Sequence, residues 1–136
     1  MEVEMLKAYG VAAAAVAVLA FAGQATAQDA EAGKKVFIKC AVCHGIGETK
    51  KPLGPSLNGV IGRTAGTEPE FAAKAAGYSK AMKEAGAAGL VWDEAAIAEY
   101  ITDPKKKVPG NKMAFAGLKV EKERLDVIAY IKTFSN

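Results

Sequence analysis

Cys40-Ala41-Val42-Cys43-His44 is the stretch of this sequence that decides its fold. The pattern C-x-x-C-H is typical of covalent haem attachment. Two thiols at this spacing can each form a thioether to one vinyl group on the same edge of a porphyrin, and the next side chain is then carried under the ring. His44 is the only histidine in the chain. The sequence therefore predicts one haem c, bound through Cys40 and Cys43, with His44 as the proximal iron ligand.

Three other uses of the cysteine pair fit the sequence less well. A redox dithiol of the thioredoxin kind normally lies in a βαβ unit, and the chain lacks a pattern of parallel strands. A zinc site requires four ligands, whereas this chain offers two thiols and one imidazole. A disulfide between Cys40 and Cys43 would close only a very small loop. Haem attachment is the favoured interpretation, and a haem-free dithiol module is the alternative.

The far side of the iron needs a second ligand, and a methionine thioether there raises the reduction potential. Two methionines follow residue 27, Met82 and Met113. Met82 lies in a helix-like stretch, where the usual role of methionine is to fill gaps in the core. Met113 follows Pro109-Gly110, which interrupts helix and sheet and predicts an extended loop. This context favours Met113 as the ligand, with a purely structural methionine as the alternative.

The N-terminal segment has the features of an export signal. Lys7 precedes an apolar run over residues 9–23, and the run ends in Ala25-Thr26-Ala27, the small-x-small pattern that signal peptidase cleaves. We therefore expect residues 1–27 to be a cleaved signal peptide, residues 28–136 to form one domain, and the mature protein to reside in the periplasm. A retained membrane anchor is the alternative, although the run is shorter than the roughly 20 residues of a membrane span.

The charge balance limits the classes of partner. The chain has 136 residues and a net charge of +3. Removal of residues 1–27 takes away Lys7, Glu2 and Glu4, a net −1, so the mature chain carries +4. This excess suits acidic protein partners, and it lacks the dense basic stripes with interleaved aromatic residues that nucleic-acid binding requires. A solvated lysine surface without a partner is the alternative.

Several further segments accompany the C-x-x-C-H motif in a characteristic order. They are Gly33, Phe37, GPSLNGVIGR at 54–63, Gly77-Tyr78-Ser79, Trp92, Tyr100, Pro104-Lys105-Lys106, PGNKMAFAG at 109–117 and Val127-Ile128-Ala129-Tyr130. Together these segments resemble the class I cytochromes c, particularly the bacterial cytochrome c2 type and its mitochondrial relatives, from about Ala32 to Phe134. The resemblance implies an all-α fold in which short helices and long loops wrap around one covalent haem.

The resemblance also implies roles for single residues. His44 and Met113 would be the axial iron ligands, and the Pro55 carbonyl would accept the ring N–H of His44. Tyr100 matches a tyrosine that hydrogen-bonds near the methionine sulphur. Three positions match those that hold or neutralise the haem propionates: Arg63, Tyr78 and Trp92.

The chain departs from the eukaryotic pattern at three places. Asn111 stands where the eukaryotic proteins have threonine, and Lys107 stands where they have tyrosine. The segment 73–76 is longer than in the short relatives. These departures concern the loops around the haem and leave the expected ligands unchanged.

The helix pattern is readable along most of the chain. Helices are predicted over about 29–39, 78–84, 93–103 and 122–134, with Ser79 and Asp93 as N-caps and Pro104 ending the third. Residues 45–78 are rich in Gly and Pro, so they are predicted to form a long loop that packs on the haem in place of a protein core.

The resemblance implies an electron carrier between a quinol–cytochrome c reductase and a terminal acceptor, which could be an oxidase, a reaction centre or a denitrification enzyme. We expect a monomer that is not an enzyme, has no small-molecule substrate and does not bind nucleic acid. Membrane redox complexes would dock on a lysine-rich face around the haem edge, formed by Lys39, Lys50, Lys51, Lys105, Lys106, Lys107, Lys112 and Lys119. The alternative is a haem peroxidase or gas sensor with a displaceable sixth ligand, although the chain lacks a second histidine.

Overall fold

The structure is a computed structural model that describes residues 27–135; residues 1–26, most of the predicted signal peptide, lie outside them. The helices are α1 (Ala30–Val36), α2 (Pro69–Ala72), α3 (Lys80–Ala87), α4 (Glu94–Thr102), α5 (Pro104–Lys107) and α6 (Glu121–Lys132). A 3₁₀ turn, η1 (Phe37–Lys39), continues α1. Within the described part of the chain, strand pairing is limited to one isolated antiparallel bridge, Thr64 to Val91. The all-α prediction is confirmed.

Local capping explains where most of the helices begin. The side chains of Asp29, Ser79 and Asp93 each accept a hydrogen bond from a backbone N–H in the first turn of α1, α3 and α4, which pairs donors that a helix leaves free at its start. The predicted caps Ser79 and Asp93 are thus confirmed. In contrast, Val120 at the start of α6 provides no side-chain cap, so this helix depends on packing.

Two helix boundaries differ from the sequence-based prediction. α3 continues to Ala87 instead of ending near residue 84, because Gly86 lets the helix pack directly on a neighbouring loop: a Cβ built on Gly86 would lie 1.9 Å from the Ala65 carbonyl oxygen. Pro104 ends the third helix as predicted, although one residue earlier than residue 103, because a proline keeps the residue before it out of the helical conformation and Asp103 is extended. That helix ends at Thr102, and Pro104 begins α5 as its first residue, a position where its missing N–H carries no cost.

The stretch 45–78 was predicted to be loop throughout, and this is wrong at residues 69–72. The short helix α2 forms there because the Glu68 carboxylate accepts a hydrogen bond from the Phe71 N–H at 2.7 Å and Pro69 occupies the first helical position. Both are local signals for a helix start. The remainder of the stretch is turns and irregular backbone.

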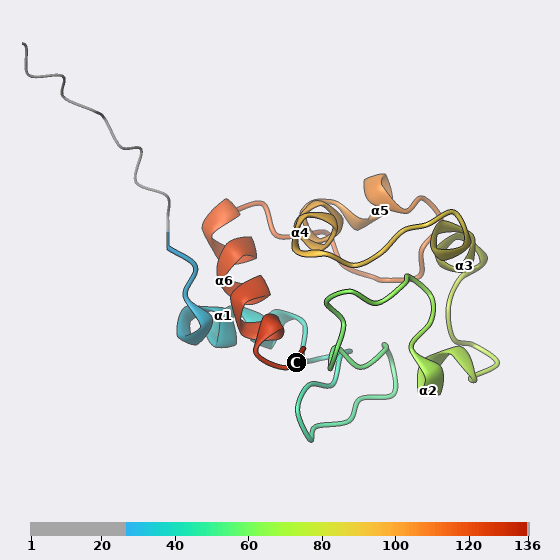
Figure 1. Cartoon of the computed structure of the whole chain (residues 1–136), viewed down its shortest axis with the longest axis horizontal. Helices are drawn as coiled ribbons and strands as arrows, with labels where there is room; N and C mark the ends of the chain where they lie inside the picture. Colours follow the sequence, from blue (N-terminus) through green and yellow to red (C-terminus); the bar gives the residue numbers. More distant parts are fainter. Residues whose placement is uncertain (1–26, 136) are drawn as a thin grey trace, which may run out of the picture.

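The crossing of α1 and α6 is the main helix–helix contact (Figure 1). A Cβ built on Gly33 would lie 1.9 Å from the Asp126 carbonyl oxygen, so only glycine permits this approach. The Phe37 and Tyr130 rings fill the adjacent space, with centroids 5.4 Å apart. Val127 and Ile128 on the inner side of α6 are each only 1% exposed.

Figure 1 shows this crossing at one end of the molecule, α2 and α3 at the other end, and long loops between them. α4 packs against both α6 and α5. No helix among residues 27–135 combines the length and the apolar character that crossing a bilayer demands. The arrangement leaves the centre of the molecule to be lined by side chains from nearly every element.

Candidate functional site

The C-x-x-C-H segment follows directly on η1 and forms one helical turn. The Cys43 and His44 N–H groups both donate to the Cys40 carbonyl oxygen, at 3.1 and 2.9 Å. Because residues three and four positions apart share a face of such a turn, both thiols and the imidazole line the same cavity. The two cysteines are free thiols, without a disulfide between them.

His44 is held in one orientation by the backbone. Its Nδ1 donates to the Pro55 carbonyl oxygen over 2.8 Å, so the proton is on Nδ1 and the lone pair of Nε2 remains available to bind a metal. Burial lowers the pKa of His44 below its usual 6.5, against the opposing effect of the bond to Pro55. The imidazole is therefore neutral at neutral pH, as metal ligation requires.

One cavity of about 580 Å³ lies at the centre of the fold. This volume falls within the range of cofactor sites, and most of the lining is apolar. All nine residues predicted from the sequence line it: Cys40, Cys43, His44, Pro55, Arg63, Tyr78, Trp92, Tyr100 and Met113. The structure thus brings together residues that are spread over the 74 positions from Cys40 to Met113.

Trp92, Tyr100 and Tyr78 are aromatic residues in the lining of this cavity. The rings of Trp92 and Tyr100 are in contact, with centroids 4.9 Å apart, and burial raises the pKa of the Tyr100 hydroxyl to about 12. Burial also raises the pKa of Tyr78, whose hydroxyl oxygen accepts a hydrogen bond from the Glu68 N–H at 3.2 Å. Both phenols are therefore neutral near pH 7 and can donate to an acceptor in the cavity.

Arg63 contributes a positive charge at the cavity wall. Its guanidinium donates to the backbone carbonyls of Ser56, at 2.9 Å, and Asn58. Within residues 27–135 no carboxylate lies within salt-bridge distance of it. A guanidinium has five N–H donors, so the charge remains available to an anionic group.

Both candidate methionines reach the cavity. Met82 lies on α3, is 8% exposed, and belongs to the hydrophobic core. Met113 is partly buried and lies in the extended segment between α5 and α6. The geometry therefore admits both, and the helix context alone does not exclude Met82.

Phe71 and Asn111 are among the cavity residues to which the sequence assigned no binding role. Phe71 on α2 packs edge-on against Tyr78, with ring centroids 4.9 Å apart, and both line the cavity. The helix-start signal at Glu68-Pro69 could have predicted that Phe71 lies on a short helix. Asn111 also lines the cavity, and the resemblance marked it only as a departure from the eukaryotic threonine.

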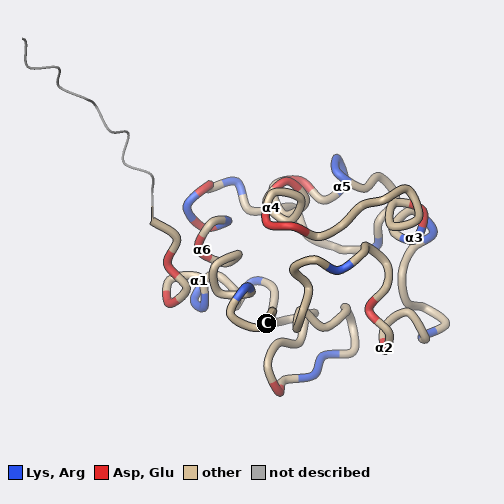
Figure 2. Tube along the Cα trace, in the orientation of Figure 1, with Lys and Arg blue, Asp and Glu red and all other residues tan. Residues whose placement is uncertain are grey.

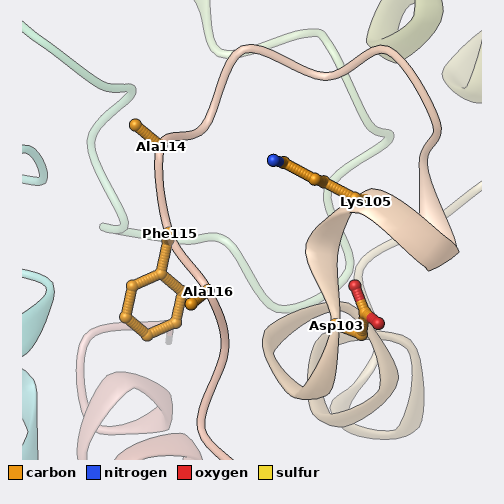
Figure 3. A pocket seen from close by; sticks show the side chains of 5 residues that line it. All are labelled: Asp103, Lys105, Ala114, Phe115 and Ala116. Atoms are coloured by element: carbon orange, nitrogen blue, oxygen red, sulfur yellow. The ribbon is translucent and has the colours of Figure 1, made fainter.

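A second, more open hollow of about 430 Å³ lies between α5 and the Met113 segment. It is lined by Asp103, Lys105, Ala114, Phe115 and Ala116 (Figure 3). Figure 3 shows Lys105 extending across the hollow and the Phe115 ring pointing away from it. Ala114 and Phe115 line the central cavity as well, so this segment is a single layer of chain between the cavity and the outside.

The structure disfavours the other uses of the cysteines. Burial raises the pKa of the Cys40 thiol to about 11, whereas a redox-active dithiol needs a lowered thiol pKa. Among residues 27–135, no group of three or more His, Cys, Asp or Glu side chains is placed to hold a metal ion, which removes the zinc interpretation for this part of the chain.

Comparison with known proteins agrees with this geometry. The family model described as Cytochrome c matches residues 30–135. The chain belongs to the cytochrome c family. Its cofactor is a covalently attached haem c, for which Cys40 and Cys43 have the required spacing, and it is an electron-carrier cytochrome.

The relatives of this cytochrome are mainly bacterial cytochromes c2. The chain is 52% identical over 109 residues to cytochrome c2 of Rhodoblastus acidophilus, covering 79% of this chain and 94% of the relative. It is 47% identical over 104 residues to cytochrome c2 of Agrobacterium tumefaciens, covering 76% and 89%. The solved structure of cytochrome c2 from Rhodobacter sphaeroides matches with a TM-score of 0.71 at 38% identity, over 80% of this chain and 98% of that one.

The site of this cytochrome fits a haem by its own chemistry. A partly buried neutral imidazole presents a free nitrogen, two thiols line the same cavity, and aromatic and aliphatic side chains form most of the remaining lining. Such walls favour a flat apolar ring, while the Arg63 charge suits a carboxylate at its edge.

Proposed function

We propose that this cytochrome carries single electrons in the periplasm, from a quinol–cytochrome c reductase to a terminal acceptor, with His44 and Met113 as axial ligands. The bound haem supplies one reversible one-electron change at its iron. The observation that carries the proposal is the convergence of His44, Met113 and the two thiols on one mostly apolar cavity. An electron carrier needs no substrate-binding or catalytic groups besides these, because it transforms no substrate.

The protein side chains set the reduction potential in this proposal. A thioether ligand stabilises the reduced iron. Buried apolar walls disfavour the extra charge of the oxidised state, since they provide no water to solvate it. Both effects raise the potential, which suits transfer from a quinol-oxidising complex to a terminal acceptor.

The polar residues of the cavity take supporting roles. We assign Arg63, Tyr78 and Trp92 to the propionates, because they provide a cation and donors at the wall. Tyr100 is assigned to the methionine side of the ring. The support is that these four residues line the cavity and that each side chain carries an N–H or O–H donor.

The predicted signal peptide places the protein in the periplasm after cleavage at Ala27. Support comes from the pattern of residues 9–27 and from the cytochrome c2 relatives. Intact-mass measurement of the exported protein tests this point: we expect a chain that begins at Gln28, and a retained leader would contradict it.

The test of the axial ligands compares two methionine variants of the holoprotein. Met113→Ala should abolish the weak far-red methionine–iron band of the oxidised protein and lower the midpoint potential. Met82→Ala is the matched control, because Met82 lines the same cavity; it should keep the band and lose only stability, by about 2–5 kcal/mol.

The far-red band distinguishes the two candidate methionine ligands, and together with carbon monoxide binding it distinguishes a carrier from a sensor or peroxidase. If Met82→Ala loses the band and Met113→Ala keeps it, the assignment is reversed. If the oxidised wild-type protein lacks the band and the reduced protein binds carbon monoxide readily at neutral pH, the sensor or peroxidase function replaces that of a carrier.

A further inference from the structure

The segment that carries Met113 has few backbone hydrogen bonds to the rest of the fold. Between residues 109 and 117, all of which the structure describes, its backbone N–H groups make two bonds to backbone carbonyls: Asn111 to Val108 and Phe115 to Met113. Both stay within the segment and its immediate start. The open hollow of Figure 3 lies behind it. The backbone alone therefore does little to hold Met113 in place.

The side chain of Asn111 provides hydrogen bonds between this segment and α5. Its Nδ2 donates to the carbonyl oxygens of Pro104, at 2.9 Å, and Val108, at 2.8 Å. Its Oδ1 accepts the N–H of Met113 at 2.8 Å. One amide thus joins both ends of α5 to the backbone of the predicted ligand. We name this set of three hydrogen bonds the Asn111 brace.

The brace is anchored in the core. Pro104 is among the most completely buried side chains of the protein, so the carbonyl at that end cannot move without disturbing the packing of α4 and α5. Asn111 is itself partly buried and lines the haem cavity. The Pro104 and Val108 carbonyls also accept the backbone N–H groups of Val108 and Asn111, at 3.0 and 3.1 Å. Loss of the brace would therefore leave the Met113 N–H as the group without its partner, and an unpaired N–H in such surroundings is costly.

Asparagine suits this position by its donor geometry. Its NH₂ group has two donors and its oxygen is an acceptor, which matches two carbonyls and one N–H. A threonine hydroxyl has a single donor, so it could not bond both carbonyls at once.

We propose that Asn111 is a positioning residue that holds Met113 against the haem and sets how readily an external ligand displaces it. This inference rests on the proposed ligation by Met113. Displacement requires the segment 109–117 to move outward, and the Asn111 brace opposes that movement. The apparent affinity of an external ligand scales with the fraction of molecules in the displaced state.

The test measures the affinity of the oxidised holoprotein for imidazole at neutral pH, together with the far-red band. Asn111→Leu keeps the number and branching of the side-chain heavy atoms and removes all three bonds. The affinity of this variant for imidazole should rise about tenfold or more, from the combined effect of three hydrogen bonds. Asn111→Thr should show a smaller rise, of roughly threefold, because it keeps part of the brace.

Asn58→Leu is the matched control. The Asn58 side chain also bridges a loop, through the N–H and the carbonyl of Gly47 at 2.7 and 2.8 Å, but it lies in the segment that follows His44. This variant should lose stability and keep the imidazole affinity of the wild type. An increase equal to that of Asn111→Leu would overturn the proposal, because it would reflect general loosening.

The proposal would also be overturned if folded Asn111→Leu bound imidazole with the affinity of the wild type. If the leucine variant does not fold, wild-type imidazole affinity in Asn111→Thr would overturn the proposal instead. If Met113 is not an iron ligand at all, a different result is expected: Met113→Ala would leave both the far-red band and the imidazole affinity unchanged.

Discussion

At the scale of single residues, the environment of the His44 ring allows no side chain at position 54. A Cβ built on Gly54 would lie 2.9 Å from His44 Cε1, 3.0 Å from Nδ1 and 3.1 Å from the Cys43 carbonyl oxygen. The ring cannot turn aside, because Nδ1 is bonded to the Pro55 carbonyl. Gly54 is thus needed for the contact between the histidine and the loop that orients it.

Gly54→Ala should therefore disturb the ligand as well as the fold. We expect a loss of about 1–3 kcal/mol in the free energy of unfolding, as for other overpacked sites, together with a shifted midpoint potential. Urea unfolding and redox titration of the holoprotein measure the two effects.

Gly89→Ala is the control that separates crowding of the His44 ring from the general cost of replacing a glycine. Gly89 has a positive φ of 101° and open space around its Cβ position, so alanine there should cost about 1–2 kcal/mol without changing the potential. A potential that is unchanged in Gly54→Ala would show that the ring tolerates the crowding.

At the scale of elements, a buried carboxylate joins the start of α1 to α6. Asp126 is 4% exposed, and its carboxylate accepts bonds from the Asp29 N–H at 3.0 Å and from Lys122 Nζ at 2.6 and 2.8 Å. The Lys122 bond, aided by the Asp29 N–H and opposed by burial, holds the pKa of Asp126 below its usual value. The carboxylate is therefore a stabilising link only in its ionised form.

This link predicts an acid-dependent loss of stability. Because the pKa of Asp126 is lower in the folded than in the unfolded chain, its contribution is complete above the unfolded value of about 3.8 and disappears as the pH falls toward the folded value. Asp126→Asn should be less stable than the wild type at pH 7, and the difference should begin to shrink only as the pH falls below about 3.8 and disappear below the folded pKa.

Urea unfolding of the holoprotein across this pH range measures the difference. Glu48→Gln, which removes an exposed negative charge, is the control and should track the wild type throughout. A difference between Asp126→Asn and the wild type that stays constant from neutral to acid pH would contradict the prediction.

At the scale of the whole molecule, lysine charges are less concentrated than the sequence suggested. Figure 2 shows basic positions on most parts of the trace, acidic positions on α4, and both kinds on α6. Four of the eight predicted docking lysines already have partners: Lys39 with Glu123, Lys50 with Glu70, Lys107 with Glu99, and Lys119 with the Thr102 carbonyl. Within residues 27–135, the other four have no acidic partner at salt-bridge distance: Lys51, Lys105, Lys106 and Lys112.

Steering of an acidic redox partner should therefore depend on the unpaired lysines near the Met113 segment. We expect the triple change of Lys105, Lys106 and Lys112 to Glu to slow association with a purified quinol–cytochrome c reductase about tenfold or more at low salt. The effect should largely vanish at about 0.5 M salt, where such charges are screened. Stopped-flow reduction at both salt concentrations measures it.

The control applies the same change to Lys34, Lys35 and Lys83, which are exposed on α1 and α3. The net charge of both variants is equal, so a comparable slowing would indicate a general charge effect and remove the argument for a docking face.

Features that depend on near neighbours in the chain were predictable from the sequence. Cys43 and His44 are three and four positions from Cys40 on one turn, so the covalent attachment of the haem, and the prediction of His44 as its proximal ligand, follow from spacing alone. The caps Ser79 and Asp93 likewise act on N–H groups within three residues. α2 was missed although its signals are equally local, because the Gly and Pro content of the surrounding stretch obscured them.

By itself, the sequence determined the haem attachment, the all-α class and the order of the main helices, because each follows from residues within one or two turns of one another. The tertiary structure decided that both methionines reach the cavity, which lysines are paired, and that Asn111 braces Met113. These features depend on contacts formed only after the chain has folded, such as Lys39 with Glu123, and no local pattern specifies which distant segment arrives beside another.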